Sequence, residues 1–158
     1  SYRRRLSAEV LLDAVSDVTG VPTSFTATWN GARALETWNF KIGSEFLDAF
    51  GRPNSSSDPP CERNTKGTVV QALHMMHSEI LHAKITHADG RAAKLAASDK
   101  APAEIAEEVF LVSLNRRPTA TESKQIAAYF EKKKDDRKGA VQDLLWAVLN
   151  TAEFLFNH

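Results

Sequence analysis

Cysteine is almost absent from this sequence of 158 residues, and the single thiol, on Cys61, limits the chemistry that the chain supports. One cysteine cannot form a disulfide within the chain, and it excludes a CxxC redox pair and a CxxCH haem-attachment motif. The sequence also has no excess charge, because 20 lysines and arginines balance 20 aspartates and glutamates. A chain without net charge has no general attraction for nucleic acid or for an anionic membrane, so we expect neither as a partner.

Long apolar runs are missing as well. No segment approaches the roughly 20 apolar residues that cross a bilayer, which predicts that the chain does not insert into a membrane. The sequence begins at Ser1 without a methionine, which indicates a piece excised from a longer protein. Because 158 residues are a typical length for one domain, we expect residues 1–158 to form a single domain.

What the sequence does contain is a series of amphipathic segments with recognisable helix boundaries. Ser7 has the position of an N-cap before an apolar stripe, and Gly20 is placed to end that helix. Residues 68–71 and 119–122 match the capping-box pattern, and Pro102 is well placed as the first residue of a helix. The helices predicted in this way cover residues 7–20, 68–82, 89–97, 102–115, 119–133 and 139–156, and residues 45–50 are long enough for one or two helical turns.

The region from about residue 20 to residue 67 follows no such pattern. It contains scattered aromatic residues and a polar loop over residues 50–64, which holds three of the six prolines. The pattern of residues 24–29 predicts a short strand there. Taken together, the segments predict an all-α fold: a single compact, bundle-like domain of five or six helices with this long irregular segment. The helix over residues 102–115 carries apolar residues on more than one side, so we expect it to be the most buried.

Four stretches of the sequence resemble a known family. They are residues 46–53 (FLDAFGRP), 61–63 (CER), 71–76 (QALHMM) and 144–158 (LLWAVLNTAEFLFNH). They are similar to the planctomycete-specific domain of unknown function at the C-terminal end of large exported proteins, often after planctomycete cytochrome-c-like and immunoglobulin-like domains. The resemblance covers essentially the whole chain. It implies an exported or periplasmic protein whose partners are the other domains of the same polypeptide, and it implies no established activity.

Two positions depart from that family pattern. The family's loop usually reads Cys-Glu-Cys-Glu-Arg, whereas Pro59 and Pro60 precede Cys61 here, so the first cysteine is replaced. The family usually has asparagine where this chain has His77. A disulfide or a two-thiol metal site general to the family is therefore not expected in this chain, and the pair of His74 and His77 is not part of the family's general pattern.

The polar loop has a catalytic interpretation and a structural one. Cys61 is a candidate nucleophile activated by His74, with Glu62 or Asp58 orienting the imidazole. In this interpretation Arg63 lowers the pKa of the thiol. In the structural interpretation the loop is a strap between helices, held by ion pairs of Arg52, Glu62 and Arg63. We favour the strap, because a lone cysteine–histidine pair in a sequence is a weak signal.

The two histidines near the loop also allow a metal site. His74 and His77 are three residues apart, so both imidazoles would reach one ion if a helix carries them. A site would need Cys61 or Glu62 as a further ligand, and a hydrogen-bonded histidine in or beside the core is the simpler interpretation. We therefore expect no metal and no other cofactor.

Five other residues are candidates for binding. Arg116 and Arg117 precede a predicted helix N-terminus, where they are placed either to bind a phosphate or carboxylate or to bond the last carbonyls of the preceding helix. Trp29 and Trp38 are candidates for a carbohydrate site in the aromatic segment. Trp146 projects off the apolar stripe of the last helix, where it is either buried by a neighbouring helix or part of a docking surface.

The leading hypothesis from the sequence is a non-catalytic helical interaction or scaffolding module within a larger exported protein. The first alternative is a hydrolase or metal-dependent domain centred on Cys61 and His74. The second alternative is a carbohydrate-binding module that uses the aromatic segment.

Overall fold

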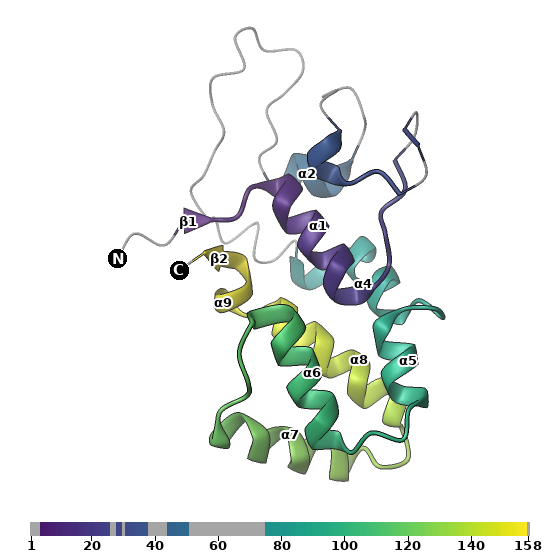
Figure 1. Ribbon diagram of the computed structural model, residues 1–158, viewed down its shortest axis with the longest axis vertical. Coiled ribbons are helices and arrows are strands. Elements are labelled where there is room, and N and C mark those ends of the chain that lie inside the picture. Colours follow the sequence, from purple (N-terminus) through teal and green to yellow (C-terminus); the bar gives the residue numbers. More distant parts are fainter. Residues whose placement is uncertain (1–3, 26–27, 30, 38–43, 51–74, 158) are drawn as a thin grey trace, which may run out of the picture.

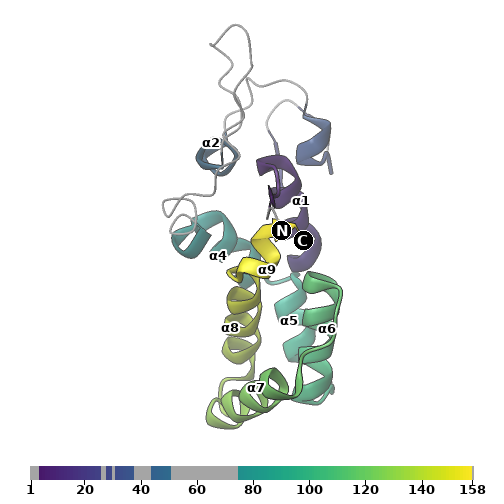
Figure 2. The same ribbon diagram turned by 90° about the vertical axis from the view of Figure 1, so that its left-hand side faces the viewer.

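The computed structural model describes residues 4–25, 28–29, 31–37, 44–50 and 75–157, and it shows the all-α fold predicted from the sequence (Figures 1 and 2). The six described helices of seven residues or more agree with the five or six expected. The α-helices are Ala8–Thr19 (α1), Glu45–Ala49 (α2), Glu79–Thr86 (α4), Arg91–Ala97 (α5), Pro102–Leu114 (α6), Ala120–Lys132 (α7), Arg137–Leu149 (α8) and Ala152–Leu155 (α9). A 3₁₀ helix, η1, spans Ala34–Glu36, and residues 75–77 are also helical.

Most helix boundaries lie where side-chain caps predict them. The hydroxyl of Ser7 accepts a hydrogen bond from the backbone N–H of Val10, and Gly20 ends α1 in the left-handed region, with φ of 69°. Thr119 and Glu122 form the predicted capping box at the start of α7, with the backbone N–H of Thr119 2.7 Å from the Glu122 carboxylate. Pro102 is the first residue of α6. Local chemistry is therefore sufficient to set these helix ends.

Two predicted helices are interrupted instead of continuous. The helix expected over residues 68–82 breaks at Ser78, whose hydroxyl caps α4 by accepting from the N–H of Leu81. The helix expected over residues 139–156 begins earlier, at Arg137, and breaks before Thr151, which caps α9. In both cases the apolar periodicity continues through the break, so the periodicity alone predicts one helix where a side-chain cap makes two.

The irregular region has one further difference. Its described residues near the strand expected at 24–29 are not in a strand, and Phe25 instead packs, partly buried, against the core. The only strands in the described part of the chain are two pairs of residues at its ends, Arg4–Arg5 (β1) and Phe156–Asn157 (β2). They pair antiparallel, with Arg4 opposite Asn157, and bring the ends of the chain side by side (Figure 1).

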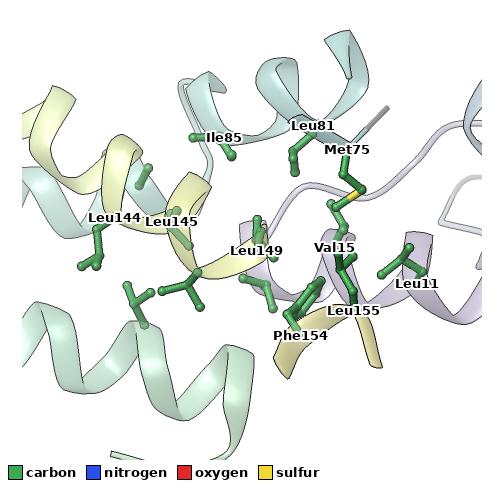
Figure 3. Packing of buried hydrophobic residues seen from close by; sticks show 14 of the residues in the cluster. Leu11, Val15, Met75, Leu81, Ile85, Leu144, Leu145, Leu149, Phe154 and Leu155 are labelled. Atoms are coloured by element: carbon green, nitrogen blue, oxygen red, sulfur yellow. The ribbon is translucent and has the colours of Figure 1, made fainter. Parts of the chain in front are cut away.

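One cluster of buried apolar side chains joins the described helices. Figure 3 shows side chains of α1, α4, α8 and α9 meeting in this cluster. Leu11 and Leu12 of α1 and Leu145 and Leu149 of α8 have no exposed surface, so truncating any one of them to alanine should cost about 2–5 kcal/mol. The core therefore extends from the first helix to the last.

The expectation that residues 102–115 form the most buried helix is wrong. In α6, Leu111 is 44% exposed and Val112 is 37% exposed, whereas α1 buries eight of its twelve residues. Helices α7 and α8, and to a lesser extent α1 and α9, pack against α6, but they leave the side that carries Leu111 and Val112 uncovered (Figure 2). An edge position in the bundle, which apolar content does not reveal, leaves these side chains uncovered.

Candidate functional site

All of the predicted catalytic residues lie outside the described part of the chain. These residues are Cys61, Asp58, Glu62, Arg63 and His74, together with the binding candidates Arg52 and Trp38. The catalytic and strap interpretations of the loop therefore stay predictions. His77 is described and is exposed, at the end of the helical residues just before the break at Ser78, not in the core. Among the described residues, no group of three or more histidine, cysteine, aspartate or glutamate side chains is arranged to hold a metal ion.

The arginine pair after α6 is engaged within the chain. Arg116 donates from Nε and Nη2 to the carboxylate of Glu153, at 2.7 and 2.8 Å, and from Nη1 and Nη2 to that of Glu122, both at 2.9 Å. Its guanidinium also lies 5.2 Å from the centre of the Phe110 ring. The hydrogen bonds from Arg116 lower the pKa of Glu122 to about 2. Arg116 thus links the end of α6 to α7 and α9.

Arg117 is placed differently from its neighbour. Its side chain is 77% exposed and forms an ion pair with Glu107 of α6 at 2.8 Å. Arg116 has little remaining capacity for an external anion, because two carboxylates surround its guanidinium. Neither arginine is described as bonding the last carbonyls of α6, the other role expected for the pair.

A polar pocket beside α1, of about 310 Å³, was not predicted from the sequence. Asp13 is buried and accepts hydrogen bonds from the backbone N–H groups of Ala34 and Leu35, at 2.7 and 3.1 Å. Asp17 accepts two hydrogen bonds from the guanidinium of Arg33, at 3.2 and 2.7 Å. These bonds fasten η1 to α1 across some twenty residues of sequence, so both carboxylates have a structural use.

Ser16, which lines this pocket, also contacts a lysine. Nζ of Lys84 lies 3.2 Å from Oγ of Ser16 and 2.6 Å from the carbonyl oxygen of Val21, and burial lowers the pKa of Lys84 to about 8. Such a pair resembles a serine nucleophile with a lysine base. However, Ser16 donates to the carbonyl of Leu12 and lies in the last turn of α1, where the negative end of the helix dipole opposes an oxyanion. We therefore interpret Lys84 as a clamp on the end of α1.

Arg91 acts as a second clamp on the same helix end. Its Nε donates to the carbonyl of Val18 at 2.7 Å, and its Nη1 pairs with Glu108 of α6 at 3.3 Å. Arg91 of α5 therefore bonds a carbonyl in the last turn of α1, and Lys84 of α4 bonds the carbonyl of Val21 just after that helix. This use of cations agrees with the negative partial charge at a helix C-terminus.

The remaining candidate is an apolar groove between α7 and α8, of about 510 Å³. Phe130 and Leu144 are its buried residues, whereas Tyr129 is 37% exposed and Trp146 is 39% exposed. Of the two positions expected for Trp146, buried by a neighbouring helix or exposed at a surface, the structure shows the exposed one. Phe130 is the only buried residue of α7, so α7 leaves most of its groove side uncovered.

One carboxylate lines this groove. Oδ2 of Asp143 accepts from the hydroxyl of Tyr129 at 2.5 Å and from Nζ of Lys133 at 2.9 Å. Partial burial acts to raise the pKa of Asp143, but these two hydrogen bonds outweigh it, so the pKa is lowered. Asp143 therefore carries its charge at neutral pH. The sequence points to Trp146 but to neither Tyr129 nor Asp143. Tyr129 and Lys133 are one helical turn apart at the end of α7, and this spacing is the only sequence signal for a polar cluster here.

The two tryptophan candidates at the aromatic segment do not form a described site. Trp29 is 63% exposed, and Trp38 lies outside the described residues. A carbohydrate site built from these two residues stays a prediction.

None of the helices in the described part of the chain is long and apolar enough to span a membrane. The longest have 13 residues, about 20 Å, against the roughly 30 Å of a hydrocarbon core.

Comparison with known families gives one match. A family model described as PSD1, protein of unknown function (DUF1553), matches residues 1–130. No curated protein and no solved structure matches the chain. The match ends within α7, whereas α8 and α9 contribute residues to the same core as α1.

Proposed function

The chain belongs to the DUF1553 family of proteins of unknown function, and we propose that it is a non-catalytic helical interaction module. In this proposal the groove between α7 and α8 docks an apolar segment from another domain of the same larger polypeptide. The observation that carries the proposal is the groove itself, with two exposed aromatic side chains beside buried apolar ones.

Exposed aromatic residues next to a hollow favour a docking role. Tryptophan and tyrosine dominate the binding energy of many protein interfaces, where they fill pockets that exclude water. Trp146 and Tyr129 have this character, because both are rigid and both line the groove. Docking an apolar segment there would remove their exposed apolar surface from water. Each Å² of apolar surface buried in this way stabilises the complex by about 25 cal/mol.

The polar clusters support a role without catalysis. The charged groups of Arg116, Arg33 and Lys84 are engaged by carboxylates, a hydroxyl and backbone carbonyls of the chain itself. Groups used in this way stabilise the fold and are poorly placed to act on a substrate.

The place of the module in a larger exported polypeptide is supported by the sequence resemblance alone. The hydrolase or metal-dependent alternative depends on Cys61 and His74, and the carbohydrate alternative depends on Trp29 and Trp38. No contact among the described residues favours either alternative.

Tryptophan fluorescence tests the docking proposal. The double variant Trp29→Phe/Trp38→Phe leaves Trp146 as the only tryptophan of the chain, which has three. On addition of the remaining domains of the polypeptide, we expect its emission to shift to shorter wavelength and its quenching by acrylamide to fall. Trp146→Ala should weaken the association by about tenfold or more, the effect of losing an interface anchor.

A matched variant controls for nonspecific effects. Trp38→Phe/Trp146→Phe keeps only Trp29, which is 63% exposed and lies away from the groove, and its quenching should not change. Unchanged quenching of Trp146 when the other domains are present would contradict the proposal.

A further inference from the structure

Resting on the proposed docking role, we infer that the groove selects a segment that carries a lysine or arginine beside its apolar anchor. The basic side chain would pair with Asp143 while the anchor packs against Trp146. The specificity of the module would then depend on charge complementarity as well as on apolar contact.

The charge of the groove lining supports this choice of occupant. Of the described residues that line the groove, Asp143 is the only charged one, and the others are apolar or aromatic apart from Gln125. A single carboxylate within an apolar lining disfavours an acidic segment and favours a basic one. An apolar segment without a cation would cover Asp143 and remove water from it without replacing its hydrogen bonds.

The hydrogen bonds of Asp143 leave it able to accept a further cation. Tyr129 and Lys133 both donate to Oδ2, and none of the described residues donates to Oδ1. An ionised carboxylate has about four acceptor positions, so Oδ1 remains available to a donor from a partner. The two internal bonds also fix the orientation of the carboxylate, which reduces the entropy lost on binding.

The ammonium of Lys133 does not cancel this preference. It is shared by two carboxylates, at 2.9 Å from Asp143 and 4.0 Å from Asp136, so the three groups together keep one negative charge. Lys133 also lies 5.8 Å from the centre of the Tyr129 ring. Its position shows that a cation is accommodated beside this carboxylate and this ring.

The spacing on α8 defines the partner sequence. Asp143 and Trp146 are three residues apart, about one helical turn, and both line the groove. A helical partner matches this spacing when its basic residue follows or precedes its anchor by three or four positions. The expected ligand is therefore a short amphipathic helix with leucine or phenylalanine one turn from lysine or arginine.

Three synthetic helical peptides test this inference. They share two leucine anchors one turn apart and differ at one flanking position, which is lysine, glutamine or glutamate. Binding is measured by the fluorescence of the Trp29→Phe/Trp38→Phe chain, in which only Trp146 reports. We expect the lysine peptide to bind about three- to tenfold more tightly than the glutamine peptide at low salt, with the ratio falling as salt is added.

Variants of the chain locate the effect. Asp143→Asn should bring the lysine-to-glutamine ratio to about one, and Asp143→Lys should make the glutamate peptide the tightest ligand. Glu131→Gln removes an exposed charge of α7 that does not line the groove, and it should leave the ratio unchanged. Thermal melts of each variant confirm that the fold is kept, which is expected because Asp143 lies at the surface.

The outcomes separate this inference from the docking proposal. If the lysine and glutamine peptides bind equally and the binding is lost only in Tyr129→Ala, the groove docks apolar segments and the selection by Asp143 is wrong. If the ratio persists in Asp143→Asn, another group selects the cation and the inference is also wrong. If no peptide binds, the inference is wrong. The docking proposal is then tested by the acrylamide quenching of Trp146 in the presence of the other domains.

Discussion

Replacing Arg116 by alanine tests whether one guanidinium holds the ends of three helices together. The substitution removes four hydrogen bonds of 2.7–2.9 Å to the carboxylates of Glu122 in α7 and Glu153 in α9. It also removes the contact of the guanidinium with the Phe110 ring of α6. The two carboxylates would then face each other without the cation between them.

The magnitude follows from the exposure of these side chains. Arg116 and Glu122 are each 32% exposed and Glu153 is 36% exposed, so water screens the two ion pairs in part. With bidentate geometry each pair contributes about 1 kcal/mol, and the ring contact adds about 0.5 kcal/mol. We expect Arg116→Ala to lower the free energy of unfolding by roughly 2–3 kcal/mol.

Urea denaturation followed by circular dichroism measures this change, and the neighbouring residue is the control. Arg117 is 77% exposed and forms a single ion pair, so Arg117→Ala should cost less than about 0.5 kcal/mol. Arg116→Lys should fall between the two, because one ammonium cannot bond both carboxylates in the bidentate way. If Arg116→Ala costs no more than Arg117→Ala, the network does not hold the helices and the reasoning is refuted.

The same variant has a pH dependence of known sign. The hydrogen bonds from Arg116 lower the pKa of Glu122 from 4.5 to about 2, so their contribution is complete above pH 4.5 and is lost as the pH falls toward 2. The difference in stability between the wild-type chain and Arg116→Ala should therefore shrink between pH 6 and pH 2.5. An unchanged difference would show that Glu122 is not paired in this way.

Three further predictions concern other parts of the chain. Asp13→Asn should cost roughly 1–3 kcal/mol in the same urea assay, because the amide keeps one acceptor oxygen and its NH₂ group then faces the second backbone donor. Asp17→Asn, at a side chain that is 59% exposed, should cost under about 1 kcal/mol, and equal costs would contradict this. Burial lowers the pKa of Lys84 to about 8, so the cost of burying the charged lysine is largest below pH 8 and disappears as the pH rises toward 10.5. The stability of the wild-type chain relative to Lys84→Met should therefore rise by roughly 2–3 kcal/mol from pH 7 to pH 10.5. A difference that does not change with pH would argue against a buried charge. Iodoacetamide should label Cys61 slowly at pH 6, and fast labelling that disappears in His74→Ala would instead favour the catalytic alternative.

Features set by neighbouring residues were predicted correctly from the sequence. Ser7, Pro102 and the Thr119–Glu122 box mark helix starts because each acts through backbone groups within three or four residues. The all-α class follows from the same local signals. The breaks at Ser78 and before Thr151 also come from local caps, but each cap lies inside an apolar stripe that predicts continuous helix.

Properties of the candidate site depend on residues that are distant in sequence. The partners of Arg116 are 6 and 37 positions away, and the clamp from Lys84 to Val21 spans 63 positions, so only the packing of the helices determines that they meet. The sequence alone therefore does not distinguish an arginine that binds an external anion from one that bonds carboxylates of its own chain. In the structure Arg116 bonds two such carboxylates.

The position of Trp146 shows the same division. The periodicity of residues 139–156 places it off the apolar stripe, and this much is a property of the sequence. Whether a neighbouring helix covers it depends on where α7 lies, and α7 packs beside α8 through Phe130 while leaving Tyr129 and Trp146 at an open groove. The groove and its single carboxylate exist because of the way α7 packs against α8. The distance and angle between two packed helices depend on the side chains of both surfaces together, so neither helix alone predicts the groove.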